Sequence, residues 1–126
     1  MPDASRRSRR LIFPSRPGPI PFSQIGILAH TAAKHALVGL TKQLSQAFGP
    51  SGNTCNVVAP GFVRSNPAPE RQWNAYGSDD QKWLVESIHV RRLGTAADIA
   101  HAVLFLVGDK AGWISDQILS MDGGRS

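Results

Sequence analysis

Cysteine is nearly absent: Cys55 is the only one among 126 residues, so no disulfide can form within the chain. Cys55 lies in an apolar run, where we expect a small buried side chain rather than a nucleophile. A lone thiol fits a reducing compartment, and we expect a cytoplasmic protein. Long apolar runs are absent as well, since none approaches the roughly 18 residues of a membrane-spanning helix.

The sequence also lacks a Gly-rich turn between a strand and a helix. Such a turn is the usual cradle for the phosphates of a dinucleotide, because it presents the free N–H groups of a helix N-terminus. Gly123 and Gly124 are not followed by any helical pattern. The histidines show no spacing typical of metal ligands, so no metal site is expected.

The net charge of +5 is concentrated at the start of the chain, where the first sixteen residues carry +4. Residues 1–10 are rich in Arg and Ser, which predicts a disordered arm before a domain over residues 11–126. An arginine arm could bind nucleic acid. No aromatic residues interleave the arginines, however, so a solvated arm is the favoured interpretation.

Residues 27–48 have the periodicity of a long helix. Apolar residues recur at steps of three and four and form a stripe: Ala29, Ala33, Ala36, Leu40, Leu44 and Ala47. Gly49 and Pro50 should end this helix. We expect a short strand at residues 11–13 and another near residues 53–58, which starts late because Asn53 is a poor strand residue.

The second half alternates in the same way. Residues 65–77 have little periodicity, and Trp73 and Tyr76 within them belong either to a cover over a binding site or to the core. Residues 79–88 have the pattern of a helix. Thr95 caps a helix over residues 96–107 that is apolar on all sides, which predicts cover on both faces. With a last strand at residues 117–121, the pattern predicts an α/β fold with parallel strands.

Four segments resemble the C-terminal half of the short-chain dehydrogenase/reductase family, in the family's order and approximate spacing. They are residues 34–41 (KHALVGLT), 56–65 (NVVAPGFVRS), 92–100 (RLGTAADIA) and 122–124 (DGG). The resemblance covers about residues 27–124. It implies the C-terminal part of a doubly wound, Rossmann-type parallel sheet whose N-terminal dinucleotide-binding half is missing here. It also implies NAD or NADP as cofactor, an alcohol or carbonyl substrate, and homo-oligomers.

The resemblance also assigns residues. Lys34 matches the lysine that binds the cofactor ribose, and His30 stands where the family has its catalytic tyrosine. Pro60, Gly61, Val63 and Ser65 match the segment that holds the nicotinamide.

The position of the family's catalytic serine is Pro17 in this chain. Ser15 is the best substitute and Ser23 a weaker one, although both are more typical of turns.

These features favour an NAD(P)-dependent oxidoreductase site that is incomplete, binds cofactor weakly and is inactive alone. An imidazole can shuttle protons near neutral pH, so His30 is either a working acid or, as we favour, a vestigial one. The alternatives are a non-catalytic oligomerisation module or pseudoenzyme fragment and, less favoured, a nucleic-acid binder.

Overall fold

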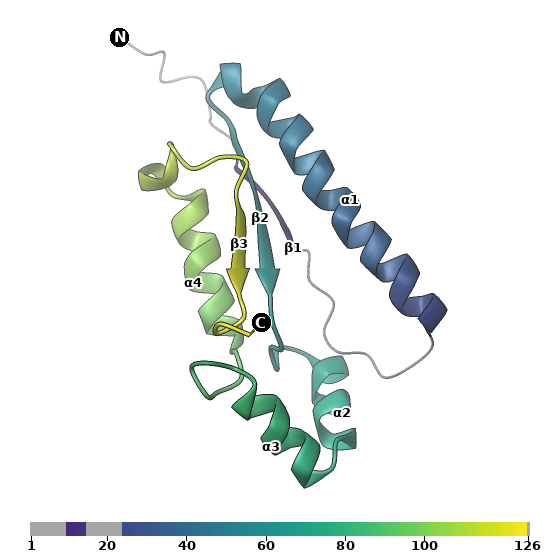
Figure 1. The fold of residues 1–126 in the computed structure, drawn as a ribbon. Helices are drawn as coiled ribbons and strands as arrows, with labels where there is room; N and C mark the ends of the chain where they lie inside the picture. Colours follow the sequence, from purple (N-terminus) through teal and green to yellow (C-terminus); the bar gives the residue numbers. More distant parts are fainter. Residues whose placement is uncertain (1–9, 15–23, 126) are drawn as a thin grey trace.

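The computed structural model describes residues 10–14 and 24–125. Three parallel strands form one sheet in the order β1 (Arg10–Pro14), β2 (Thr54–Pro60), β3 (Ile118–Met121). Helix α1 (Gln24–Phe48) lies on one face of the sheet and α4 (Ala96–Val107) on the other (Figure 1). The predicted α/β fold with parallel strands is therefore confirmed. β1 begins at Arg10, one residue inside the expected arm, whose other residues lie outside the described ranges.

β2 is the central strand and forms the core. Residues Thr54 to Ala59 are all buried, and Val57 is fully inaccessible to solvent. The strand starts at Thr54, which agrees with the late start expected from Asn53. Cys55 is 2% exposed, and burial raises the pKa of its thiol. The expected role of Cys55 as a buried small side chain agrees with this environment.

Asn56 ties β2 to the segment that leads into β3. Its Nδ2 donates to the Ile114 carbonyl oxygen (2.9 Å), and its Oδ1 accepts from the Gln117 N–H (3.1 Å). The side chain is 2% exposed. A buried amide with both ends bonded fixes the start of β3 against β2, because leaving either partner unpaired would cost free energy.

The apolar stripe of α1 does not face the sheet. Ala29, Ala33 and Ala36 are exposed, and Leu40 is 46% exposed. The buried position is Thr41, whose hydroxyl donates to the Leu37 carbonyl oxygen at 2.7 Å. Small side chains dominate the stripe, so periodicity alone identified an apolar face without identifying what it packs against.

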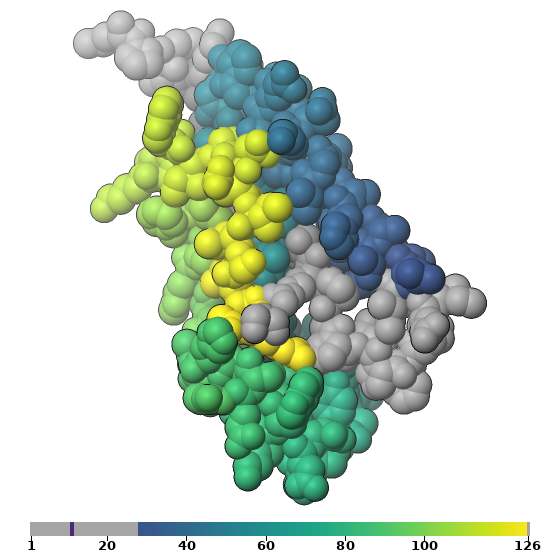
Figure 2. Space-filling model, in the orientation of Figure 1, coloured from purple at the N-terminus to yellow at the C-terminus, as the bar shows by residue number. Residues whose placement is uncertain are grey.

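The expectation that α4 is covered on both faces is wrong for this chain. Leu106 is buried at 3% exposure, but Leu104 is 65%, Phe105 52% and Val107 43% exposed. Only the sheet side of the helix is covered within the described residues. β3 is an edge strand of the sheet. It lies at the surface seen in Figure 2, where its residues are yellow, and its Ile118 is 53% exposed.

Two short helices lie at the end of the sheet where the strands end (Figure 1): α2 (Pro67–Ala75) and α3 (Ser78–Glu86). α3 was predicted, whereas the irregular structure expected across residues 65–77 was wrong. Asn66 caps α2 by accepting the Ala68 N–H at 3.0 Å, and Pro67 occupies the first turn. Asn followed by Pro is a helix-start signal that outweighs the missing apolar period.

Replacing Asn56 with Ala should destabilise the protein by about 1–3 kcal/mol, because the Ile114 carbonyl and the Gln117 N–H lose their partner. Urea denaturation followed by far-UV circular dichroism measures the change. Asn74→Ala, the same substitution at an exposed position of α2, is the control and should shift the midpoint far less. Equal shifts for both variants would contradict the role given to Asn56.

Candidate functional site

His30 and Lys34 lie one turn apart in the N-terminal half of α1, the half that lies toward the ends of the strands (Figure 1). Both side chains are partly buried, whereas Ala29 and Ala33 beside them are exposed. The Nε2 atom of His30 is buried and has no hydrogen-bond partner among the described residues. A buried polar nitrogen left unpaired is unusual in a folded protein.

The end of β2 approaches the end of β3 closely at Gly61. The Gly61 N–H donates to the Met121 carbonyl oxygen at 3.0 Å. A Cβ atom at Gly61 would lie 2.7 Å from the Asp122 Cβ and 2.8 Å from its Cα. No larger residue fits here without moving backbone, so Gly61 sets the exit of the chain from β2 at the carboxyl edge of the sheet.

Val63 and Ser65 lie in the loop that leaves this edge. Val63 forms a parallel bridge with Gly94, and the Gly94 N–H donates to the Phe62 carbonyl oxygen at 3.1 Å. The Ser65 N–H donates to the Val63 carbonyl oxygen at 3.1 Å, and its side chain is exposed. The loop is thus held by backbone bonds on both sides of Val63.

Phe62 anchors the aromatic side chains of α2 and of the turn after it. Its ring centroid lies 6.2 Å from that of Trp73 and 6.3 Å from that of Tyr76. These tilted contacts are the usual arrangement of packed aromatic rings. Arg64 stacks over Trp73 at 5.8 Å and pairs with Glu70 at 2.8 Å. Of the two expectations for Trp73 and Tyr76, packing against the domain is what the contacts favour.

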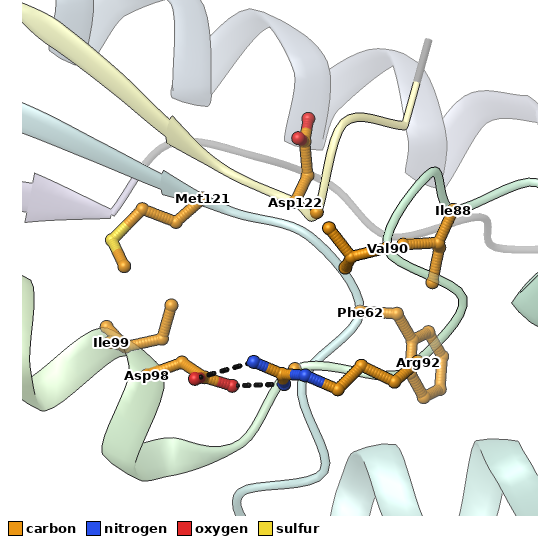
Figure 3. Close-up of a pocket in the computed structure, with 10 residues that line it drawn as sticks. Phe62, Ile88, Val90, Arg92, Asp98, Ile99, Met121 and Asp122 are labelled. Atoms are coloured by element: carbon orange, nitrogen blue, oxygen red, sulfur yellow. Dashed lines mark hydrogen bonds and ion pairs between the residues drawn. The ribbon is translucent and has the colours of Figure 1, made fainter.

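A cavity of about 210 Å³ opens on the α4 side of the same edge (Figure 3). Its walls come from the loop after β2, the segment after α3, the start of α4 and the end of β3. Along one wall, Arg92 and Asp98 form a two-pronged ion pair with distances of 2.7 and 3.0 Å. The motif that contains Arg92 and Asp98 was visible in the sequence, but nothing in it indicated a cavity.

Asp98 also completes the cap of α4. Its carboxylate accepts the Thr95 N–H at 2.8 Å, while the Thr95 hydroxyl oxygen accepts the Asp98 N–H at 3.2 Å. The guanidinium of Arg92, and then these bonds from Thr95, hold the pKa of Asp98 well below its usual range. The expected capping residue of this helix is therefore confirmed, and its carboxylate is charged at neutral pH.

Other predicted features fall outside this geometry. Ser15 and Ser23 lie outside the described residues, so neither is placed relative to His30. Within the described ranges, no three His, Cys, Asp or Glu side chains could hold a metal ion. No helix among them is both long and apolar enough to cross a membrane.

Comparison with known proteins decides the family. Residues 22–126 match the family model described as enoyl-(acyl carrier protein) reductase. A short-chain dehydrogenase/reductase of Serratia marcescens superposes with a TM-score of 0.70 at 32% identity, over 93% of this chain and 44% of that one. This chain belongs to the short-chain dehydrogenase/reductase family.

Curated members of the family are similar over the same region. The 3-oxoacyl-[acyl-carrier-protein] reductase FabG of Escherichia coli is 36% identical over 75% of this chain and 37% of its own length. The (2S)-[(R)-hydroxy(phenyl)methyl]succinyl-CoA dehydrogenase subunit BbsD of Thauera aromatica is 35% identical over 80% of this chain and 39% of its own. The chain thus spans less than two fifths of the length of these short-chain dehydrogenases.

The Arg92–Asp98 pair predicts a pH dependence. Because the pKa of Asp98 is lower in the folded state than in the unfolded chain, its stabilising effect is present above about pH 4 and is lost as the pH falls below that. Thermal melts from pH 7 to pH 2 should show Asp98→Asn less stable than the unmodified chain at neutral pH, with the gap closing in acid. Asp109→Asn, at an exposed carboxylate that forms no ion pair among the described residues, should show no such gap. A gap of constant size across the range would contradict this assignment.

Proposed function

We propose that this chain supplies the C-terminal part of an NAD(P)-dependent oxidoreductase site acting on the alcohol or carbonyl group of a small molecule. Lys34 holds the ribose of the cofactor, and the segment from Pro60 to Ser65 receives the nicotinamide. The bound cofactor would supply or accept a hydride. The observation that carries the proposal is the position of His30 and Lys34, partly buried on α1 toward the edge where β2 ends, just before Gly61. In open α/β sheets, dinucleotides bind outside this carboxyl edge.

The phosphates of the cofactor have no cradle among the described residues, because no Gly-rich turn there leads from a strand into a helix. Ribose and nicotinamide contacts alone should give weak binding. The proposal therefore includes dependence on a dinucleotide-binding half, which the relatives' greater length suggests. Without that half we expect this chain to be inactive.

His30 occupies the position of the proton donor without performing its role. The imidazole is shorter than a phenol, and its buried Nε2 has no described partner that would fix its tautomer. A donor must reach the substrate oxygen at hydrogen-bond distance. The imidazole of His30 thus stands at the donor position without acting as an effective acid.

Exposed apolar surface supports a homo-oligomer. The outer face of α4 carries Leu104, Phe105 and Val107, and the stripe of α1 presents alanines and Leu40. Contiguous apolar patches beyond a few hundred Å² are uncommon on soluble monomers and mark association sites. We propose that copies pair through α1 and α4, in a cytoplasmic setting that keeps the buried thiol of Cys55 reduced.

The donor hypothesis is tested by fusing the N-terminal half of the E. coli relative to this chain and comparing the unmodified fusion with its His30→Tyr variant. Oxidation of NADPH with a 3-oxoacyl-[acyl-carrier-protein], the compound in that relative's name, is the readout. His30→Tyr should raise the rate at least tenfold, since general-acid catalysis contributes roughly 10²–10⁴-fold. His30→Phe should stay at the unmodified level, and Lys34→Ala should lose NADPH binding by fluorescence.

If the unmodified fusion is as active as the His30→Tyr variant, His30 is a working acid and the vestigial assignment is wrong. If NADPH binds but no variant turns over, the proposed catalytic role of this chain is wrong.

Association is tested by light scattering after size exclusion at several concentrations. The unmodified chain should elute as a dimer or larger species, and the double variant Leu104→Lys, Phe105→Glu should shift it toward monomer. Trp113→Gln, at a side chain 99% exposed outside both helices, should leave the distribution unchanged. A sharp monomer at every concentration for the unmodified chain would overturn the proposal.

A further inference from the structure

The cavity beside α4 is separate from the position of His30 and Lys34. None of its lining residues belongs to α1, which lies on the opposite face of the sheet (Figure 1). Its walls are mostly apolar, and Figure 3 shows Met121 and Ile99 on one side of an open space and Val90 on the other, with Ile88 beyond Val90. Phe62 also lines the cavity.

The charged groups at its walls are already engaged. Both terminal nitrogens of Arg92 donate to Asp98, and one of them also donates to the Leu93 carbonyl oxygen at 3.1 Å. Asp122 accepts the Gly124 N–H at 3.0 Å. A charged ligand would have to compete with these bonds for a partner, whereas a neutral apolar ligand leaves them intact. The chemistry of the cavity therefore selects against charge.

The size of the cavity limits its occupant. An engineered apolar cavity of about 150 Å³ stays dry and takes up benzene. The present 210 Å³ suits a neutral apolar group of the size of one substituted ring. We propose that this cavity is a binding site for a small, neutral, apolar ligand or ligand moiety, and that its occupancy holds the α2–α3 segment against the sheet.

The proposed effect on the α2–α3 segment follows from the residues that the ligand would contact. Ile88, which is 2% exposed, comes two residues after the end of α3, and Val90 follows it. A Cβ atom at Gly123 would lie 2.6 Å from the Ile88 Cγ2 and 2.7 Å from the Val90 Cγ2, so this segment already presses on the end of β3. Phe62 contacts Trp73 of α2 from the other direction. An occupant would contact Ile88, Val90 and Phe62 and so add to the contacts that hold this segment.

Toluene and benzoate form a matched pair of probes, since they share ring and size but differ in charge. We would titrate each into the full chain with ¹³C-labelled Ile and Met methyl groups and follow the spectrum. Toluene should shift the methyl signals of Ile88, Ile99 and Met121 in a saturable way, and benzoate should not. Amide hydrogen exchange in α2 and α3 should slow at least threefold with toluene bound.

Ile99→Phe, which fills the cavity, should weaken toluene binding at least tenfold. Ile118→Phe, the same change at an exposed position of β3, should leave it unchanged. If Ile99→Phe does not fold, Met121→Ala enlarges the cavity and should admit n-butylbenzene, which the unmodified chain excludes. The site is disproved by absent or unsaturable toluene shifts, by equal binding of benzoate, or by equal binding to Ile99→Phe. Unchanged exchange in α2 and α3 on binding would disprove the proposed coupling.

Discussion

The structure depends on the burial of β2 between the two other strands. Both β1 and β3 hydrogen-bond to it, and α1 packs on one of its faces. Asn56 of β2 is hydrogen-bonded at both ends of its amide, and Thr41 of α1 lies against the buried Cys55. A strand so enclosed directs its carboxyl end to one place. The buried strand therefore fixes the position of Gly61, and with it the position of the loop that contains Val63.

The features that sequence predicts well are those set by local chemistry. α4 has the predicted bounds because Thr95 and Asp98 cap it and a continuous apolar run follows. β2 starts at Thr54, directly after Asn53, whose side chain disfavours a strand. α1 ends at Phe48, where Gly49 and Pro50 were expected to end it. Each of these elements is determined by side chains within a few residues of its own ends, so no knowledge of the tertiary structure is needed.

Features that depend on residues distant in the sequence could not be predicted from the sequence alone. The alanine stripe of α1 is as apolar as a core-facing surface, and only tertiary contacts reveal that Thr41 is the buried position. The same limit applies to α4, whose uniform apolarity suggested two covered faces although Leu104 and Phe105 are exposed here. The family resemblance located His30 and Lys34 in sequence. It could not show that the His30 Nε2 is buried without a described partner.

Phe62 links the two regions of interest at the carboxyl edge. It follows Gly61 directly, its ring contacts Trp73 and Tyr76, and the residue also lines the cavity beside α4. Its carbonyl oxygen accepts the Gly94 N–H, which fixes the loop containing Val63. A displacement of Phe62 would therefore affect both α2 and the cavity, because close-packed groups cannot move independently. The segment proposed to receive the nicotinamide and the cavity proposed for an apolar ligand thus share the residue Phe62.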